Sequence, residues 1–248
     1  MTRQPLERPT ESPFRIWDFV IVMALTFGAA AVGSVVALIV SPPDELTTEG
    51  LLSDPMLIGI SLVFQLLGTF AGLAVVKAIR RASIEDFGLP ITGSDASGIL
   101  WGLGFLVPLL GVGLLVETLD LEAPSGGAGA ALGGMDNPWF AIGAVLAIGV
   151  FGPLAEELTY RAVLQGSLRR RFAPITAILI TSLVFAPLHI QAGPGVTVFI
   201  LIALIFALSI MLGWLVERDG GRIGRAFFAH ATYNSMQVLA VLVGLAEV

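Results

Sequence analysis

Apolar residues gather in seven long stretches of the chain, and polar residues lie mainly between them. The stretches cover residues 16–40, 56–76, 98–116, 138–154, 175–190, 196–216 and 226–245. A helix that crosses the hydrocarbon core of a bilayer needs about 20 predominantly apolar residues. The pattern therefore predicts an all-α protein, a polytopic membrane helical bundle with about seven transmembrane helices.

Composition supports a membrane protein and excludes several kinds of site. Of the 248 residues, 56% are hydrophobic and 13% are charged, whereas soluble domains carry roughly a quarter charged residues. The chain has no cysteine, which rules out a disulfide framework, a thiol nucleophile and a zinc–thiolate site. We expect the lipid bilayer as a partner and no nucleic acid.

The basic residues predict the orientation of the helices. Apart from Arg161, every Lys and Arg lies in the amino-terminal tail or in one of three segments, residues 77–81, 169–171 and 218–225. The alternate loops carry no base. By the positive-inside rule, the amino terminus is cytoplasmic and the carboxyl terminus lies outside, in a multi-pass protein of the cell membrane.

The segments between the apolar stretches suggest how the chain is organised. Residues 1–15 carry three prolines and read as a disordered cytoplasmic tail. Residues 16–137 hold the first three apolar helices with their loops, and residues 138–246 hold the remaining four. Between the second and third helices, residues 84–90 are expected at the membrane interface, with Phe87 and Leu89 in the headgroup layer.

Charged side chains directly after an apolar run mark the first candidate site. The segment contains Glu156, Glu157 and, four residues after the second acid, Arg161. Residues four apart share a helix face, so Glu157 and Arg161 can pair while Glu156 points about 100° away. One carboxylate is then neutralised and one is spare. The alternative is a helix that leaves the bilayer at Glu156, because three arginines follow at 169–171.

Both histidines of the chain, His189 and His230, lie in apolar helices. Taken alone, His189 reads as an interfacial hydrogen-bonding residue, and His230 with Asn234, four residues on, as a polar contact between helices. Glu156 lies 16 residues before the turn at Phe172 and His189 lies 17 after it. In an antiparallel hairpin both are therefore about 25 Å from the turn, which places a carboxylate beside an imidazole.

One difficulty concerns depth. His230 lies only about 8 Å from the basic loop that ends at Arg225, if the helix is straight. We therefore expect the hairpin that carries Glu156 and His189 to tilt toward the cytoplasm, with a cavity opening on that side. A carboxylate base, an imidazole and further donors in one cavity suit the activation of water.

Three motifs occur in order on successive apolar helices: Glu-Glu-x-x-x-Arg, Phe-x-x-x-His and His-x-x-x-Asn. The matching residues are Glu156, Glu157, Arg161, Phe185, His189, His230 and Asn234. Together the motifs resemble the intramembrane proteases related to the type II CAAX prenyl endopeptidases, whose bacterial members form the CPBP or bacteriocin-processing and immunity family. The resemblance covers residues 138–246, which would form a CAAX protease-like catalytic core.

The resemblance implies an endopeptidase that acts on membrane-associated peptides or proteins. Glu156 would activate a water that His189 holds. The oxyanion would be stabilised by His230 and Asn234. Glu157 and Arg161 would form a supporting ion pair. No cofactor is then required. The alternative is a zinc ion held by Glu156, His189 and His230, although no His-Glu-x-x-His helix is present.

Two other functions compete with the protease. The first is a non-catalytic immunity or scaffolding protein on the same fold, for which the spare glutamate would have no use. The second is a transporter, which usually shows repeat symmetry, and the sequence shows no internal repeat.

Overall fold

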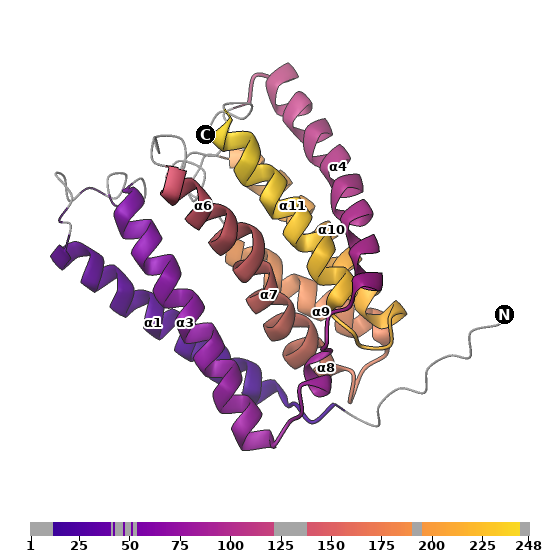
Figure 1. Ribbon diagram of the computed structural model, residues 1–248. Helices are drawn as coiled ribbons and strands as arrows, with labels where there is room; N and C mark the ends of the chain where they lie inside the picture. Colours follow the sequence, from indigo (N-terminus) through magenta and orange to yellow (C-terminus); the bar gives the residue numbers. More distant parts are fainter. Residues whose placement is uncertain are drawn as a thin grey trace.

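A computed structural model describes residues 12–40, 42, 47, 51, 54–121, 138–189 and 195–243, and in these residues all regular structure is helical (Figure 1). The predicted all-α class is thereby confirmed. The long helices before the Glu-Glu segment are α1 (Ile16–Val40), α3 (Pro55–Arg80) and α4 (Gly98–Thr118), with the short 3-10 turns η1 (Glu85–Phe87) and η2 (Gly93–Ser97) between α3 and α4.

The second half of the chain contains four further helical segments. The first is composite and runs through α6 (Pro138–Leu146), η3 (Ala147–Phe151), α7 (Gly152–Glu156), η4 (Glu157–Gln165) and α8 (Gly166–Leu168). The second is α9 (Pro174–Phe185), extended by the 3-10 turn η5 (Ala186–His189). The last two are α10 (Gly195–Arg218) and α11 (Gly224–Leu242).

Five of the described helical segments are long and apolar enough to cross a membrane, namely Ile16–Val40, Pro55–Arg80, Gly93–Thr118, Ile142–Leu168 and Val196–Arg218. The other two predicted spans differ for identifiable reasons. The segment Pro174–His189 is apolar but shorter, and α11 carries His230, Asn234 and Gln237 among its apolar residues. The chain is a multi-pass membrane protein.

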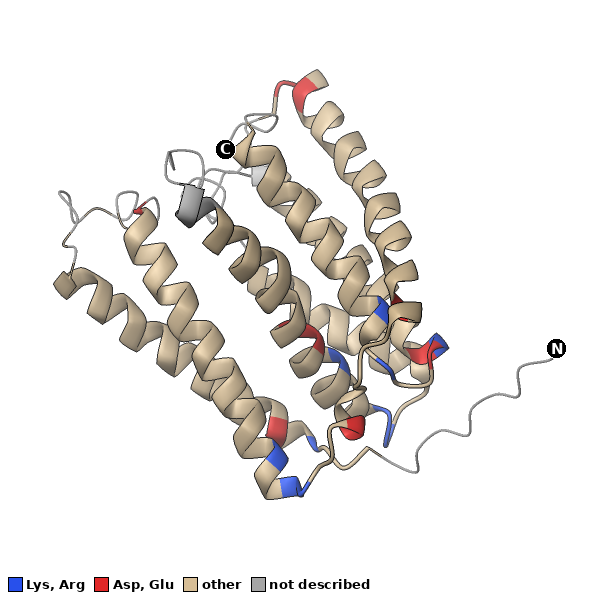
Figure 2. Cartoon of the chain, in the orientation of Figure 1, with Lys and Arg blue, Asp and Glu red and all other residues tan. Residues whose placement is uncertain are grey.

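Charge separates the two ends of the bundle. Figure 2 shows that the described Lys and Arg residues lie at one end of the bundle, apart from the single arginine of η4. Acids at that end pair with them: Asp18, with its side chain fully buried, binds Arg80 at 2.8 Å, and Asp95 binds Arg222 at 2.7 Å. These ion pairs tie the start of α1 to the end of α3, and η2 to the loop before α11.

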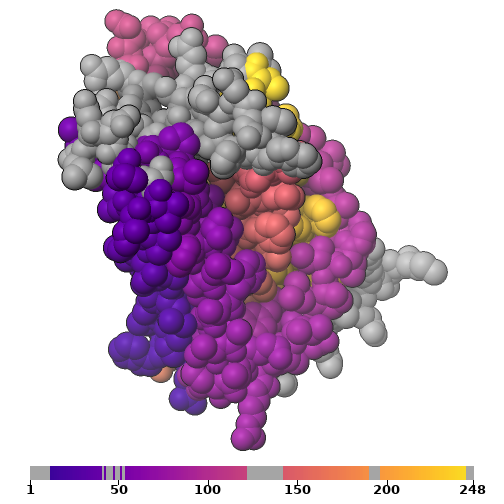
Figure 3. Space-filling model, turned by 60° about the vertical axis from the view of Figure 1, so that its left-hand side comes forward, coloured from indigo at the N-terminus to yellow at the C-terminus, as the bar shows by residue number. Residues whose placement is uncertain are grey.

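Helices α1 and α3 form an antiparallel pair at one side of the bundle, and the α6 region is visible between this pair and α4 (Figure 3). Small residues permit a close approach, because a Cβ on Gly72 would lie 2.9 Å from the Cα of Val22. Hydroxyl groups also join the pair: Thr26 and Thr69 are 2.9 Å apart, and so are Ser34 and Ser61.

Helix α4 supports α11 through a small-residue motif. A Cβ on Gly98 would overlap the main-chain oxygen of Arg225, and a Cβ on Gly102 would overlap that of Ala229. Such small-xxx-small spacing lets helix backbones approach closely in a membrane. Since Ala229 directly precedes His230, this contact fixes the height and rotation of the histidine.

Gly102→Val should therefore destabilise the protein and disturb His230. We expect a loss of roughly 1–3 kcal/mol in the free energy of unfolding, typical of overpacking, with a matching fall in activity. Thermal unfolding in detergent measures the first effect. Gly104→Val is the matched control, because a Cβ on Gly104 meets no atom within 4 Å. Equal effects of the two substitutions would contradict the role given to this contact.

Two expectations near the amino terminus were wrong. Phe87 is not in the headgroup layer: its side chain is buried in the protein, and its ring centroid lies 4.7 Å from that of Phe14. Phe14 is fully buried, so the last residues of the predicted disordered tail are packed. Residues 1–11, the glycine-rich part of the loop at 122–137 and the turn at 190–194 lie outside the described residues.

Candidate active site

A proline shapes the helix that carries the acids. Pro153 has no N–H, so the carbonyl of Gly149, four residues before it, lacks its usual helical donor. The carbonyl of Ile148 would usually accept from Gly152, which bonds elsewhere. The N–H of Gly152 donates to the Ala147 carbonyl in a π-helical turn. Two side chains of α11 satisfy the freed carbonyls: the Asn234 amide donates to Ile148 at 3.2 Å, and the Ser235 hydroxyl donates to Gly149 at 3.3 Å. The turn before Glu156 is thus docked on α11.

The two adjacent glutamates lie in different environments, as their helical spacing predicts. Glu157 is fully buried, and its carboxylate lies 3.3 Å from the Nε of Arg161, whose side chain is also fully buried. Glu156 instead lines a cavity with 30% of its side chain exposed. One carboxylate is therefore paired inside the protein and the other faces open space.

Apart from Glu157, few contacts among the described residues stabilise the buried positive charge of Arg161. Its guanidinium carbon lies 5.2 Å from the centroid of the Phe185 ring, a cation–π contact. The buried guanidinium nitrogens have no well-formed hydrogen bond among the described residues. The pair with Glu157 is therefore the main interaction that offsets the cost of burying this charge.

His230 is held by the paired glutamate and faces the spare one. Its Nδ1 lies 2.9 Å from Oε1 of Glu157, and its Nε2 lies 3.6 Å from Oε2 of Glu156. A carboxylate that pairs with an arginine only accepts hydrogen bonds, so Nδ1 donates to Glu157. This contact leaves Nε2 directed at Glu156.

His189 has the same arrangement with a different partner. Its Nδ1 donates to the main-chain carbonyl of Phe185 at 2.9 Å, which fixes the tautomer because a carbonyl can only accept. Its Nε2 lies 3.8 Å from Oε2 of Glu156. The ring also packs on Phe185, with the two centroids 4.3 Å apart.

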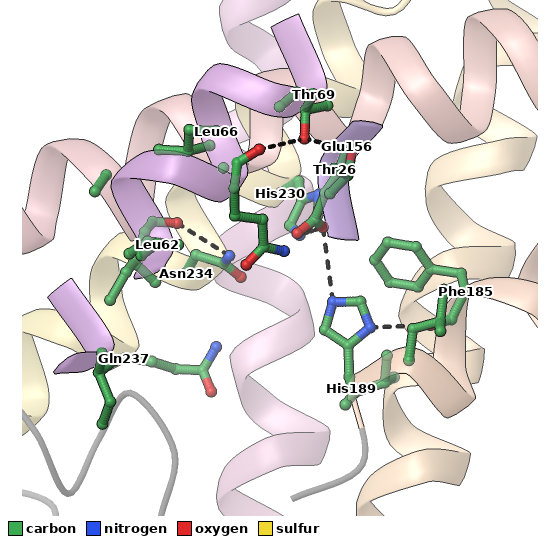
Figure 4. A pocket seen from close by; sticks show the side chains of 18 of the residues that line it. Thr26, Leu62, Leu66, Thr69, Glu156, Phe185, His189, His230, Asn234 and Gln237 are labelled. Carbon is green, nitrogen blue, oxygen red and sulfur yellow. Dashed lines mark hydrogen bonds and ion pairs between the residues drawn. The ribbon is translucent and has the colours of Figure 1, made fainter. Parts of the chain in front are cut away.

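The expected residues thus meet at one place. Figure 4 shows Glu156, His189, His230 and Asn234 around a single cavity, with Phe185 behind His189. Both imidazoles direct Nε2 toward one oxygen of Glu156, at distances slightly longer than a direct hydrogen bond. A polar atom between these groups would have a proton acceptor and two ring nitrogens within reach, which is the arrangement required for activating water.

The cavity has a volume of about 890 Å³ and is lined by α1 and α3 on one side and by the second half of the chain on the other. Beyond Glu156 and the histidines, its lining runs along the bundle to Ser34, Leu57, Val198 and Val241. These four lie near the end opposite the basic loops. The cavity therefore extends toward the end of the bundle opposite the basic loops, and the expected opening at the basic end stays a prediction.

Two features of this site were not expected from the sequence. The Asn234 amide is not wholly available to a ligand, because one of its hydrogens is directed at Ile148. The contribution of α1 and α3 to the cavity wall was also missed. Pro153 could have indicated that a carbonyl near it needs a side-chain donor such as Asn234. Polar residues at spacings of four within α3 could have indicated that this helix lines a cavity.

The site has some features of a zinc centre. Glu156, His189 and His230 are suitable ligand types, and each imidazole already donates its Nδ1–H to an acceptor, as metal-binding histidines do. Besides pairing with Arg161 as expected, Glu157 accepts a hydrogen bond from His230. Among the described residues, however, no three His, Asp or Glu side chains are arranged to hold a metal ion.

Comparison with known proteins agrees with the three motifs. Residues 138–236 match the family model described as type II CAAX prenyl endopeptidase Rce1-like, which confirms the resemblance drawn from the sequence. No curated protein and no solved structure matches the chain. The match implies a protease in general terms. The division of the chain into tail, amino-terminal helices and catalytic core stays a prediction.

Proposed function

We propose that this chain, which matches a prenyl endopeptidase family over residues 138–236, is an intramembrane endopeptidase that hydrolyses membrane-associated peptides or proteins. The observation that carries the proposal is the meeting of three groups at one cavity wall. The Glu156 carboxylate faces two imidazoles, and each imidazole is held by its Nδ1 so that Nε2 points into the cavity.

In the proposed reaction, a water lies between Glu156 and Nε2 of His189. Glu156 takes a proton as the water oxygen attacks the peptide carbonyl carbon, and the carbonyl oxygen becomes an oxyanion. His230 and the free amide hydrogen of Asn234 stabilise that oxyanion. The proton on Glu156 then passes to the leaving amine as the C–N bond breaks, which restores the carboxylate.

Glu157 has a specific task in this scheme. In this scheme the Nδ1 of His230 donates to Glu157 while its Nε2 is the atom that meets the oxyanion. The Glu157 carboxylate, 2.9 Å from Nδ1, holds the ring so that Nε2 faces the cavity. Arg161 holds the Glu157 carboxylate in place through their ion pair. Glu157 and Arg161 therefore act through His230 as positioning residues.

We also propose the orientation and the partners that follow from the charge pattern. The end with the Lys and Arg side chains is cytoplasmic, in the cell membrane, and so is the amino terminus. The partners are the bilayer and a membrane-associated peptide or protein substrate, without nucleic acid. The alternative is a non-catalytic immunity or scaffolding role, and the following experiment distinguishes it from a peptidase.

The direct test compares membrane fractions from cells that express the wild type with those that express Glu156→Gln, at equal protein levels. Quantitative proteomics of membrane-derived peptides should find fragments that accumulate only with the wild type. Fragments that appear equally with both proteins would contradict a peptidase whose base is Glu156. A phenotype of the wild type that Glu156→Gln retains in full would favour the non-catalytic role.

A metal is not required by this scheme, and that is a separate prediction. Active, purified protein should contain well under one zinc per chain, and a chelator should not switch its activity off reversibly. Elemental analysis and activity measurements after chelation and metal add-back test this. One tightly bound zinc per chain, with activity lost on stripping and restored by zinc alone, would make Glu156, His189 and His230 its ligands.

A further inference from the structure

A row of three polar residues lies on the face of α3 that lines the cavity. Ser61, Gln65 and Thr69 are spaced four residues apart, so they share one helix face. The outer two are bonded to α1, since Ser61 meets Ser34 and Thr69 meets Thr26, each at 2.9 Å. Gln65, the middle residue of the row, makes no such side-chain bond to α1.

The Gln65 side chain has no such partner. Its main-chain carbonyl accepts from Thr69, but among the described residues no hydrogen bond reaches its side-chain amide, and the residue is exposed. A free amide on an apolar helix is unfavourable in contact with lipid. Gln65 avoids that cost because it lines the cavity rather than the outer surface.

Gln65 belongs to the wall that faces the catalytic groups. Helix α3 packs against α7, the short helix that ends at Glu156. In Figure 4, the α3 residues Leu62, Leu66 and Thr69, which surround Gln65 in the sequence, lie across the cavity from His189. The amide is therefore carried by the wall opposite His189.

The remainder of the lining indicates which chemistry the cavity recognises. Apart from Glu156 and the two histidines, its described polar side chains are hydroxyls and amides, and none of them is Lys or Arg. Neutral donors and acceptors suit the main chain of a peptide, whereas a terminal carboxylate would find no cation on this wall. A side-chain amide offers one acceptor and two donors, as a peptide group needs.

We propose that Gln65 is a substrate-positioning residue whose amide hydrogen-bonds the main chain of a short, extended, uncharged peptide segment between α3 and Glu156. This proposal rests on the proposed peptidase function for its biological meaning. Recognition of the main chain gives affinity that tolerates different side chains, as when a peptide adds to the edge of a sheet. A cavity of about 890 Å³ is within the range of pockets for small ligands and short peptides.

Binding, rather than cleavage, tests the proposal. The full chain carrying Glu156→Gln, so that no probe is consumed, is placed in lipid nanodiscs, with empty nanodiscs as the blank. The probe is fluorescent acetyl-Ala-Leu-Ala-Leu-Ala-amide, measured by anisotropy, beside the same peptide with methylated amide nitrogens. Adding Gln65→Met should weaken binding of the first peptide about tenfold, the effect of a net hydrogen bond or two.

The methylated peptide identifies the group that Gln65 binds. Methylation should weaken binding to the protein that keeps Gln65, and should matter less once Gln65→Met is present. Ser61→Ala is the matched control and should change affinity less than twofold, because its hydroxyl is bonded to Ser34. Failure of the unmodified peptide to bind, or equal affinity with and without Gln65, would overturn the proposal. Binding that depends on Gln65 without any proteolysis would reject only the proposed peptidase function.

Discussion

Glu156→Gln should remove proteolytic activity while the purified protein unfolds at close to the wild-type temperature. Loss of a general base typically costs about 10²–10⁴-fold in rate, and the amide cannot take a proton from water. The fold should tolerate the change because Glu156 faces a cavity with 30% of its side chain exposed and has no arginine partner. Removing its charge therefore leaves no buried cation alone.

Two measurements on the same preparations decide this prediction: cleavage of a substrate found by the proteomic comparison, and thermal unfolding in detergent. Glu85→Gln is the matched control, because Glu85 is an exposed residue of η1 outside the cavity, and it should cleave normally. Cleavage by Glu156→Gln at the wild-type rate would refute the catalytic role. Loss of activity together with a large loss of stability would mean that Glu156 is structural.

Much of the fold could be predicted because helix periodicity and membrane thickness are strong constraints. The first predicted helix, residues 16–40, has the bounds of α1, and five others differ from the structure by a few residues at their ends. The fourth, predicted over residues 138–154, continues in the structure to Leu168. The Glu157–Arg161 contact followed from spacing alone. Equal distances from one turn also predicted that Glu156 and His189 would meet, and they lie 3.8 Å apart.

The missed features depend on contacts between segments far apart in the chain. Phe87 is an aromatic residue in a short segment between two apolar helices, as an interfacial residue would be. Only its packing on Phe14 shows that it is buried. The cavity extends away from the basic loops because α1 and α3 line it as far as Ser34 and Leu57, which no helical period reveals. Pro153 is visible in the sequence. Nothing in the sequence shows that Asn234 and Ser235 bond the free carbonyls in the turn before it.

The Glu157–Arg161 pair should make the largest contribution to stability among the site residues. Glu157→Gln leaves a fully buried guanidinium without its carboxylate, and Arg161→Ala leaves a fully buried carboxylate without its cation. Breaking a buried ion pair in this way costs roughly 3–5 kcal/mol for either single substitution. Activity should fall as well, because Glu157 also holds Nδ1 of His230 at 2.9 Å.

The double substitution should cost less than the sum of the two, because it leaves neither charge unpaired. The shortfall, measured as a double-mutant cycle on the free energy of unfolding in detergent, is the coupling between the two side chains. Arg171→Ala is the matched control, since Arg171 is exposed in the turn after α8, and it should change stability by less than about 0.5 kcal/mol. Strictly additive effects of Glu157→Gln and Arg161→Ala would show that the pair is not coupled, and the position of the His230 ring would then depend on Glu157 alone.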